Sequence, residues 1–358
     1  MKKEKNLQLT LVSLFTRHRE IGLLLIAVVL MAVVGLRNPL FLTGDKILFI
    51  LKDTAPLFVL AAGMMCVLLV GSIDISVTGI MALSAMLAAM LMRQSLVVTD
   101  TTVLIDGVET AVRTKTGLPL IVIVLAAMGI GGLCGALNGV IIAYGKVLPV
   151  VTTLGMQYIL YGFAHVVSSG QAVYKKDMTD AFVAFARQDI LGVNAQTWIM
   201  AVCLLFMFLF VTYFRSGRHM YAVGSNREAA EMRGISTGRT ILMAHIIMGV
   251  LAGLAGVMFG SHDTKITQDL KMGYEMYVIA ACVIGGVSVT GGSGKVTAVL
   301  LGALIIGVIN NGLPMMRLTG DAEFWKKLIQ GLLILIAIII NVVLRRMTIR
   351  RELKGRKI

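Results

Sequence analysis

The sequence predicts an all-α polytopic membrane protein with about ten transmembrane helices and both termini in the cytoplasm. Of its 358 residues, 57% are hydrophobic and only 15% are charged, whereas soluble domains carry about 25% charged residues. The mean hydropathy is +0.87, and long apolar runs recur along the chain. A soluble core could not bury this much apolar surface, so most of the chain is expected to lie in lipid.

Ten apolar runs are candidate spans, since crossing the hydrocarbon core takes about 20 residues of helix. Residues 71–74 and 290–295 separate two pairs of runs by so little that each predicts a tight reversal, and merging either pair would lower the count. The ten runs are residues 21–36, 55–70, 75–92, 119–143, 150–168, 198–214, 240–260, 276–290, 296–313 and 326–345.

The distribution of basic residues predicts the orientation. Placing both termini, 71–74, 144–149, 215–239 and 290–295 on one side collects 19 of the 33 lysine and arginine residues there, and the richer side is expected to be cytoplasmic. The first run has no small-residue cleavage site before it, so it is expected to be a retained span. The chain thus divides into a cytoplasmic segment 1–20, a single transmembrane domain 21–345 with a cytoplasmic loop 215–239, and a basic tail 346–358.

Glycines recur at helical spacing in two of the runs. Gly131, Gly135 and Gly139 are four residues apart, as are Gly249 and Gly253. Small residues at this spacing let two helix backbones approach closely in lipid. The outer segments 93–118, 169–197 and 261–275 are expected to be solvated loops that form a modest surface where a soluble protein could dock.

Several kinds of site are not expected. The net charge of +14 comes from termini and loops without interleaved aromatic residues, so nucleic acid is not an expected partner. The cysteines and histidines are widely spaced, which predicts neither a metal site nor a disulfide framework. Residues 291–295 read Gly-Gly-Ser-Gly-Lys but lack the first glycine and the final Ser or Thr of a phosphate loop. We therefore expect no catalytic residues, no cofactor and no ATP site in this chain.

The loop 215–239 is a polar island with five arginines between two apolar runs. Ser225 and Glu228 have the spacing of a capping box, helix formers follow, and Gly234 can end a helix in the left-handed conformation. The sequence thus predicts a two-turn helix that either contacts a partner or merely joins two spans. Its candidate contact residues are Ser225, Asn226, Arg227, Glu228, Ala229, Ala230, Arg233 and Gly234.

Polar residues inside the runs are few. Asp74 is the only acid that this assignment places near the membrane interior. Asp74 or Ser72 is expected to cap the third span, with a proton relay through Asp74 as the alternative. Neutral amides and hydroxyls suit either a hydrated path for a polyol or sugar, or hydrogen bonds between helices. The tentative path residues are Asn138, Thr152, Gln157, Asn310 and Asn311.

Several short blocks occur in a fixed order along the chain. Residues 71–77 read Gly-Ser-Ile-Asp-Ile-Ser-Val, 221–224 read Tyr-Ala-Val-Gly, 228–230 read Glu-Ala-Ala, 285–288 read Gly-Gly-Val-Ser and 291–294 read Gly-Gly-Ser-Gly. Together these blocks resemble the permease subunits of ribose-type ABC importers, from about residue 20 to 345. Ser72 stands where the family pattern has a second glycine. The motif residues are Gly71, Asp74, Gly285, Gly286, Gly291 and Gly292.

The resemblance implies a set of partners and a location. It implies a multi-pass subunit in the bacterial cytoplasmic (inner) membrane, paired with itself or a close relative. Two cytoplasmic ABC ATPase subunits would bind ATP and Mg and dock on the helix at 228–234, and an extracytoplasmic sugar-binding protein would deliver a pentose, hexose, deoxysugar or autoinducer-2. A nucleoside ABC permease, or a secondary transporter or facilitator without an ATPase, is the alternative.

Overall fold

The structure is a computed structural model that describes residues 19–105 and 108–316 and isolated positions between 324 and 339. Nearly all of the predicted segment 1–20, the tail 346–358 and most of the tenth run lie outside the described residues. The helices are α2 (Arg19–Arg37), α3 (Gly44–Leu69), α4 (Val77–Gln94), α5 (Leu120–Ala143), α6 (Pro149–Val167), α7 (Asp180–Phe185), α8 (Ala195–Tyr213), α9 (Arg215–Ser225), α10 (Arg227–Met232), α11 (Thr237–Asp263), α12 (Glu275–Ile284) and α13 (Val296–Met315), with 3-10 turns η1 (Pro39–Leu42) and η2 (Lys175–Asp177).

Eight helices of the described residues are long and apolar enough to cross a membrane: α2, α3, α4, α5, α6, α8, α11 and α13. This confirms the predicted polytopic all-α class. The second run begins earlier than predicted, at Gly44, because charged residues in the first half of α3 interrupt its apolar pattern without breaking the helix. The eighth run is instead the ten-residue helix α12, which is too short to cross a bilayer alone.

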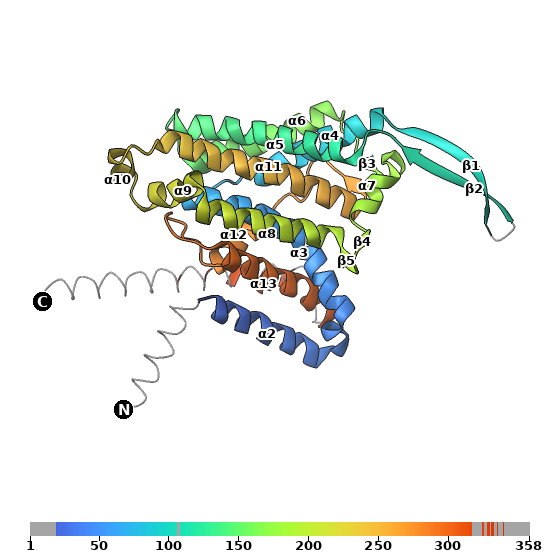
Figure 1. The fold of residues 1–358 in the computed structure, drawn as a ribbon, viewed down its shortest axis with the longest axis horizontal. Helices are drawn as coiled ribbons and strands as arrows, with labels where there is room; N and C mark the ends of the chain where they lie inside the picture. Colours follow the sequence, from blue (N-terminus) through green and yellow to red (C-terminus); the bar gives the residue numbers. More distant parts are fainter. Residues whose placement is uncertain are drawn as a thin grey trace, which may run out of the picture.

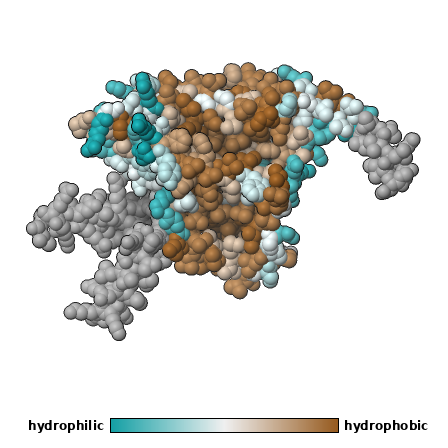
Figure 2. All heavy atoms as spheres, in the orientation of Figure 1, coloured by the Kyte–Doolittle hydropathy of each residue, from teal (hydrophilic) through white to brown (hydrophobic). Residues whose placement is uncertain are grey.

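The long helices run side by side along the longest axis of the molecule, with α9 and α10 at one end and a β-hairpin at the other (Figure 1). Figure 2 shows a broad hydrophobic band between these ends, with hydrophilic residues gathered over both of them. An apolar belt between two polar ends fits a bilayer, and the α9–α10 end is the one predicted to be cytoplasmic.

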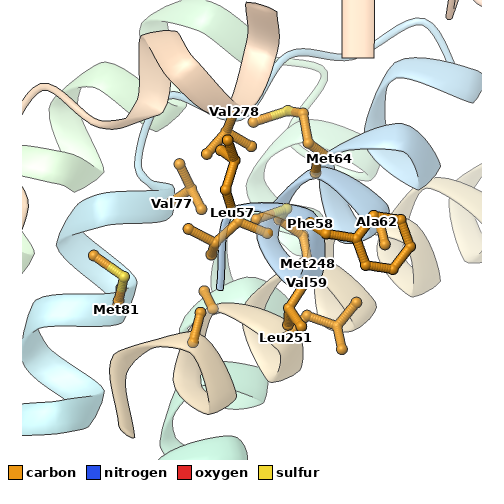
Figure 3. Packing of buried hydrophobic residues seen from close by; sticks show 14 of the residues in the cluster. Leu57, Phe58, Val59, Ala62, Met64, Val77, Met81, Met248, Leu251 and Val278 are labelled. Carbon is orange, nitrogen blue, oxygen red and sulfur yellow. The ribbon is translucent and has the colours of Figure 1, made fainter. Parts of the chain in front are cut away.

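Helix α3 lies at the centre of the bundle. Two thirds of its most apolar stretch, 67%, is buried inside the protein, against 28% for the peripheral helix α2. Leu57 and Phe58 of α3 pack with Met248 of α11 and Val278 of α12, all at most 1% exposed (Figure 3). Helix α3 contacts α8, α11, α12 and α13. Because the core is closely packed, a shift of any of these helices would disturb the packing around α3.

The predicted close approach of two glycine-rich helices is confirmed for α5 and α11. A Cβ atom on Gly135 would overlap the carbonyl oxygen of His245, and one on Gly131 would overlap that of Gly249. Backbone therefore packs directly on backbone along this seam, which only glycine allows.

The outer end has more regular structure than the solvated loops that the sequence predicted. β1 (Val97–Ile105) and β2 (Val108–Thr116) pair antiparallel, with Val97 opposite Thr116, and project from the bundle (Figure 1). The backbone N–H of Lys115 donates to the Asp180 carboxylate at 2.7 Å, which ties the hairpin to α7. Two smaller pairs lie nearby: β3 (Val173–Tyr174) with β6 (Lys265–Ile266), and β4 (Asp189–Ile190) with β5 (Val193–Asn194).

Candidate functional site

The polar island 215–239 forms two helices, α9 and α10, where the sequence predicted one. The prediction that Ser225 caps the second helix is wrong, because Ser225 is the last residue of α9. Asn226 is the cap instead: its extended backbone breaks the helix, and its side-chain oxygen accepts from the N–H of Ala229 at 2.9 Å. The predicted left-handed end at Gly234 is confirmed by its φ of +77°.

One face of α10 is exposed, and the other packs against the rest of the protein. Ala230 is buried, whereas Arg227, Glu228 and Arg233 are exposed, and no ion pair within the described chain involves these three. Met232 is 84% exposed at the end of the same short helix. An apolar side chain surrounded by unpaired charges is a surface suited to a protein partner.

The glycines of the sequence motifs meet beneath this island. Gly71, Gly291 and Gly292 all have positive φ, from +74° to +93°, which glycine adopts without strain. The Gly292 N–H donates to the carbonyl of Leu69 at 2.9 Å, and a Cβ atom on Gly224 would overlap that same carbonyl. Three backbones therefore meet at one junction: the ends of α3 and α9 and the loop 285–295.

The loop 285–295 also connects the island to α12. The Tyr221 hydroxyl of α9 donates to the carbonyl of Gly294 at 2.9 Å. Burial raises the pKa of Tyr221 to about 12, so this donor stays protonated at physiological pH. At the start of the loop, Gly285 packs on the backbone of α13 and Gly286 has a φ of +86°. The loop 285–295 therefore joins α9, through the Tyr221 hydrogen bond, to the C-terminal end of α12.

Asp74 lies in the non-helical segment between α3 and α4 and is fully buried. Neither Asp74 nor Ser72 is the N-cap residue of α4: that position is Ser76, whose own side chain forms no cap hydrogen bond. One carboxylate oxygen accepts from the N–H and hydroxyl of Ser76 at 2.9 and 2.6 Å, and the other lies 3.2 Å from Nδ1 of His245. Asn138 donates to the Ser76 hydroxyl at 2.7 Å. These bonds hold the segment against α5 and α11.

A second buried acid, Glu275, was missed by sequence reasoning. It is the first residue of α12 and only 8% exposed. The Thr78 hydroxyl donates to its carboxylate at 2.8 Å, and the Gln157 side-chain amide donates to that hydroxyl at 3.0 Å. The predicted span 276–290 excludes Glu275, which therefore falls in the predicted outer segment 261–275. No local signal distinguishes a buried acid at a helix start from a solvated one.

The tentative path residues do not gather in one place. Gln157 belongs to the Glu275 cluster and Asn138 to the Asp74 network. Thr152 is half-buried and its hydroxyl donates to the carbonyl of Leu148, at the start of its own helix. Asn311 donates to Asp53 of α3 at 2.8 Å, beside the half-buried Asn310. A path role for these residues stays a prediction.

The comparisons with known proteins agree with this architecture. A family model described as branched-chain amino acid transport system / permease component matches residues 46–338. The chain belongs to this permease family. Eight apolar helices in the described part of the chain, together with relatives that are import permeases, make it a multi-pass protein of the inner membrane. No solved structure matches the permease.

Curated relatives cover nearly the whole permease. It is 32% identical over 320 residues to the ribose import permease protein of Escherichia coli K12, covering 89% of this chain and 92% of that protein. Identity to the ribose import permease protein of Bacillus subtilis 168 is 33%, with coverage of 87% and 89%. Identity to the D-allose transport system permease protein of Escherichia coli K12 is 31%, with coverage of 89% and 90%.

Proposed function

We propose that this chain is the transmembrane subunit of an ATP-binding-cassette importer that moves a sugar or sugar-like molecule into the cytoplasm. The observation that carries the proposal is identity of 31% to 33% along about nine tenths of the chain to permeases named for ribose and D-allose. The family description names branched-chain amino acids instead, so these are the competing substrate class, together with nucleosides.

The α9–α10 end is the proposed docking surface for the ATPase. Its exposed charges Arg227, Glu228 and Arg233 can form charge-assisted hydrogen bonds, and Met232 can enter an apolar groove. The helix is held at both ends, by Asn226 and Gly234, so it can move as a rigid body. The glycine junction beneath it offers a physical route from a partner's motion to α3 and α12.

The remaining partners follow from the same proposal. ATP and Mg would be bound by the partner ATPases. An extracytoplasmic binding protein would deliver the sugar at the hairpin end, and a second permease, identical or related, would complete the pathway. Selection among pentoses, hexoses, deoxysugars and autoinducer-2 would rest partly on that binding protein.

The test is reconstitution of the permease in vesicles with its ATPase and binding protein. Uptake of ribose, galactose, autoinducer-2, a nucleoside and leucine is measured with and without ATP, beside a matched complex with a hydrolysis-deficient ATPase. We expect ATP-dependent uptake of one sugar-like compound. Uptake that proceeds equally without ATP, or that follows a proton gradient, would refute the ATP-driven mechanism, and uptake of leucine or a nucleoside alone would refute the sugar assignment.

A further inference from the structure

The Glu275 cluster lies where two interrupted helices begin. Glu275 is the first residue of α12 and Thr78 is the second residue of α4, and their side chains are hydrogen-bonded at 2.8 Å. Figure 3 shows Val77, the neighbour of Thr78, and Val278, one helical turn after Glu275, near Leu57 in the central core. Both helix N-termini therefore point their partial positive charge at one place inside the bundle.

Glu275 has no basic partner among the described residues. No ion pair in that part of the chain involves it, and the side-chain hydrogen bond to its carboxylate comes from the neutral Thr78 hydroxyl. An ionisable group inside a membrane domain is costly and is retained for a function in most cases. The helix N-termini can stabilise the carboxylate, but they leave hydrogen-bond acceptor sites on it unused, since a carboxylate can accept about four.

A buried hydroxyl beside the cluster is also unused. Tyr161 lies one turn after Gln157 on α6 and is 8% exposed. Its hydroxyl lies close to the side chains of Thr78, Gln157 and Glu275, but within the described chain no partner is placed in hydrogen-bonding geometry with it. The cluster therefore combines a carboxylate acceptor, an amide and a free hydroxyl, which is the set that recognises the vicinal hydroxyl groups of a sugar.

At the outer end of the bundle, α4 and the segment after α6 border a cavity. A cavity of about 320 Å³ is lined by Met90, Arg93 and Gln94 of α4 and by Ser168, Gln171 and Val173 just beyond α6. Arg93 lies fifteen residues after Thr78 along α4, which corresponds to about 22 Å of helix. The seam between α4 and α6 thus runs from an outer cavity to the buried cluster.

We propose that Glu275, positioned by Thr78 and Gln157, is a specificity-determining residue that contacts a hydroxyl group of the sugar inside the membrane, with Tyr161 donating to the same ligand. This inference rests on the proposed function. The outer cavity admits the sugar, and the cluster binds it when the helices separate during transport. The site selects neutral polyols, because the carboxylate repels anions and an apolar side chain would leave its polar groups unpaired.

The test uses the reconstituted importer with the transported sugar and its monodeoxy analogues. Wild type is expected to prefer the sugar over at least one analogue. Glu275→Ala should reduce that one preference by about tenfold or more, as expected for a lost hydrogen bond to a charged group. Preference over the other analogues and the rate of ATP hydrolysis should stay as in wild type.

Two further variants separate recognition from folding. Glu275→Gln keeps the shape and should reduce the same preference while assembling normally. Gln196→Leu, a fully buried amide bonded to the Met258 carbonyl elsewhere in the bundle, is the matched control and should change no preference.

An equal fall in uptake of every analogue, or wild-type preferences in both Glu275 variants, would overturn the inference and leave the proposed function standing. Failure of the wild-type complex to transport any sugar is a different result, since it refutes the proposed function before any variant is made.

Discussion

The glycine junction makes a sharp prediction for Gly224→Ala. The new methyl group would overlap the carbonyl oxygen of Leu69 and lie 2.5 Å from the amide nitrogen of Gly292, whereas Cβ atoms essentially never come within 3.0 Å of another heavy atom. Both neighbours are backbone, so no side chain can rotate away. The end of α9 must therefore separate from the end of α3 and from the loop 285–295.

The cost follows from two contributions. Overpacking of this kind destabilises by about 1–3 kcal/mol. Separation of the backbones also breaks the hydrogen bond from Gly292 to Leu69, which contributes about 1 kcal/mol. The packed arrangement of α9 thus loses about 2–4 kcal/mol, and the equilibrium constant that favours it falls roughly 30-fold or more. The clash involves only the last residue of α3, the end of α9 and the loop 285–295, so insertion and assembly should be normal.

The assay is sugar uptake per ATP hydrolysed in reconstituted vesicles. We expect Gly224→Ala to hydrolyse ATP but to lose about tenfold or more of its uptake per ATP. Gly129→Ala is the matched control, because Gly129 lies on an exposed face of α5 with nothing within 4 Å of an added Cβ atom. Wild-type uptake per ATP in Gly224→Ala would show that the junction does not couple the island to the bundle.

Three further predictions concern single contacts. Gly135→Ala should lower the free energy of unfolding by about 1–3 kcal/mol through overlap with the His245 carbonyl, seen as a lower melting temperature in detergent; a melting temperature like that of Gly129→Ala would contradict the close packing. Asp74→Ala should lower the free energy of unfolding by about 1–3 kcal/mol because it leaves the buried Ser76 N–H and His245 Nδ1 without their partner, and an unchanged melting temperature would show that these hydrogen bonds are dispensable. Glu228→Lys should insert normally but separate ATP hydrolysis from uptake, and normal coupled uptake would remove Glu228 from the docking surface.

Much of the architecture could be predicted because lipid imposes one simple rule. Every span must satisfy its own backbone hydrogen bonds and present apolar side chains, and both requirements are visible as runs in the sequence. Glycine spacing likewise predicted the seam at Gly135, and Gly234 predicted the end of α10, because only glycine accepts these conformations at low cost.

What the sequence could not decide depends on residues distant along the chain. Asp74 looked like a local cap, but His245, 171 residues away, and Asn138 decide its role. Glu275 looked like a loop residue, but it is buried and accepts a hydrogen bond from Thr78, 197 residues away. By itself the sequence determined the class, most of the spans and the polar island, because those follow from local hydrophobicity. The tertiary structure alone decided which polar groups meet inside the bundle, because their hydrogen-bond partners are set by helix packing.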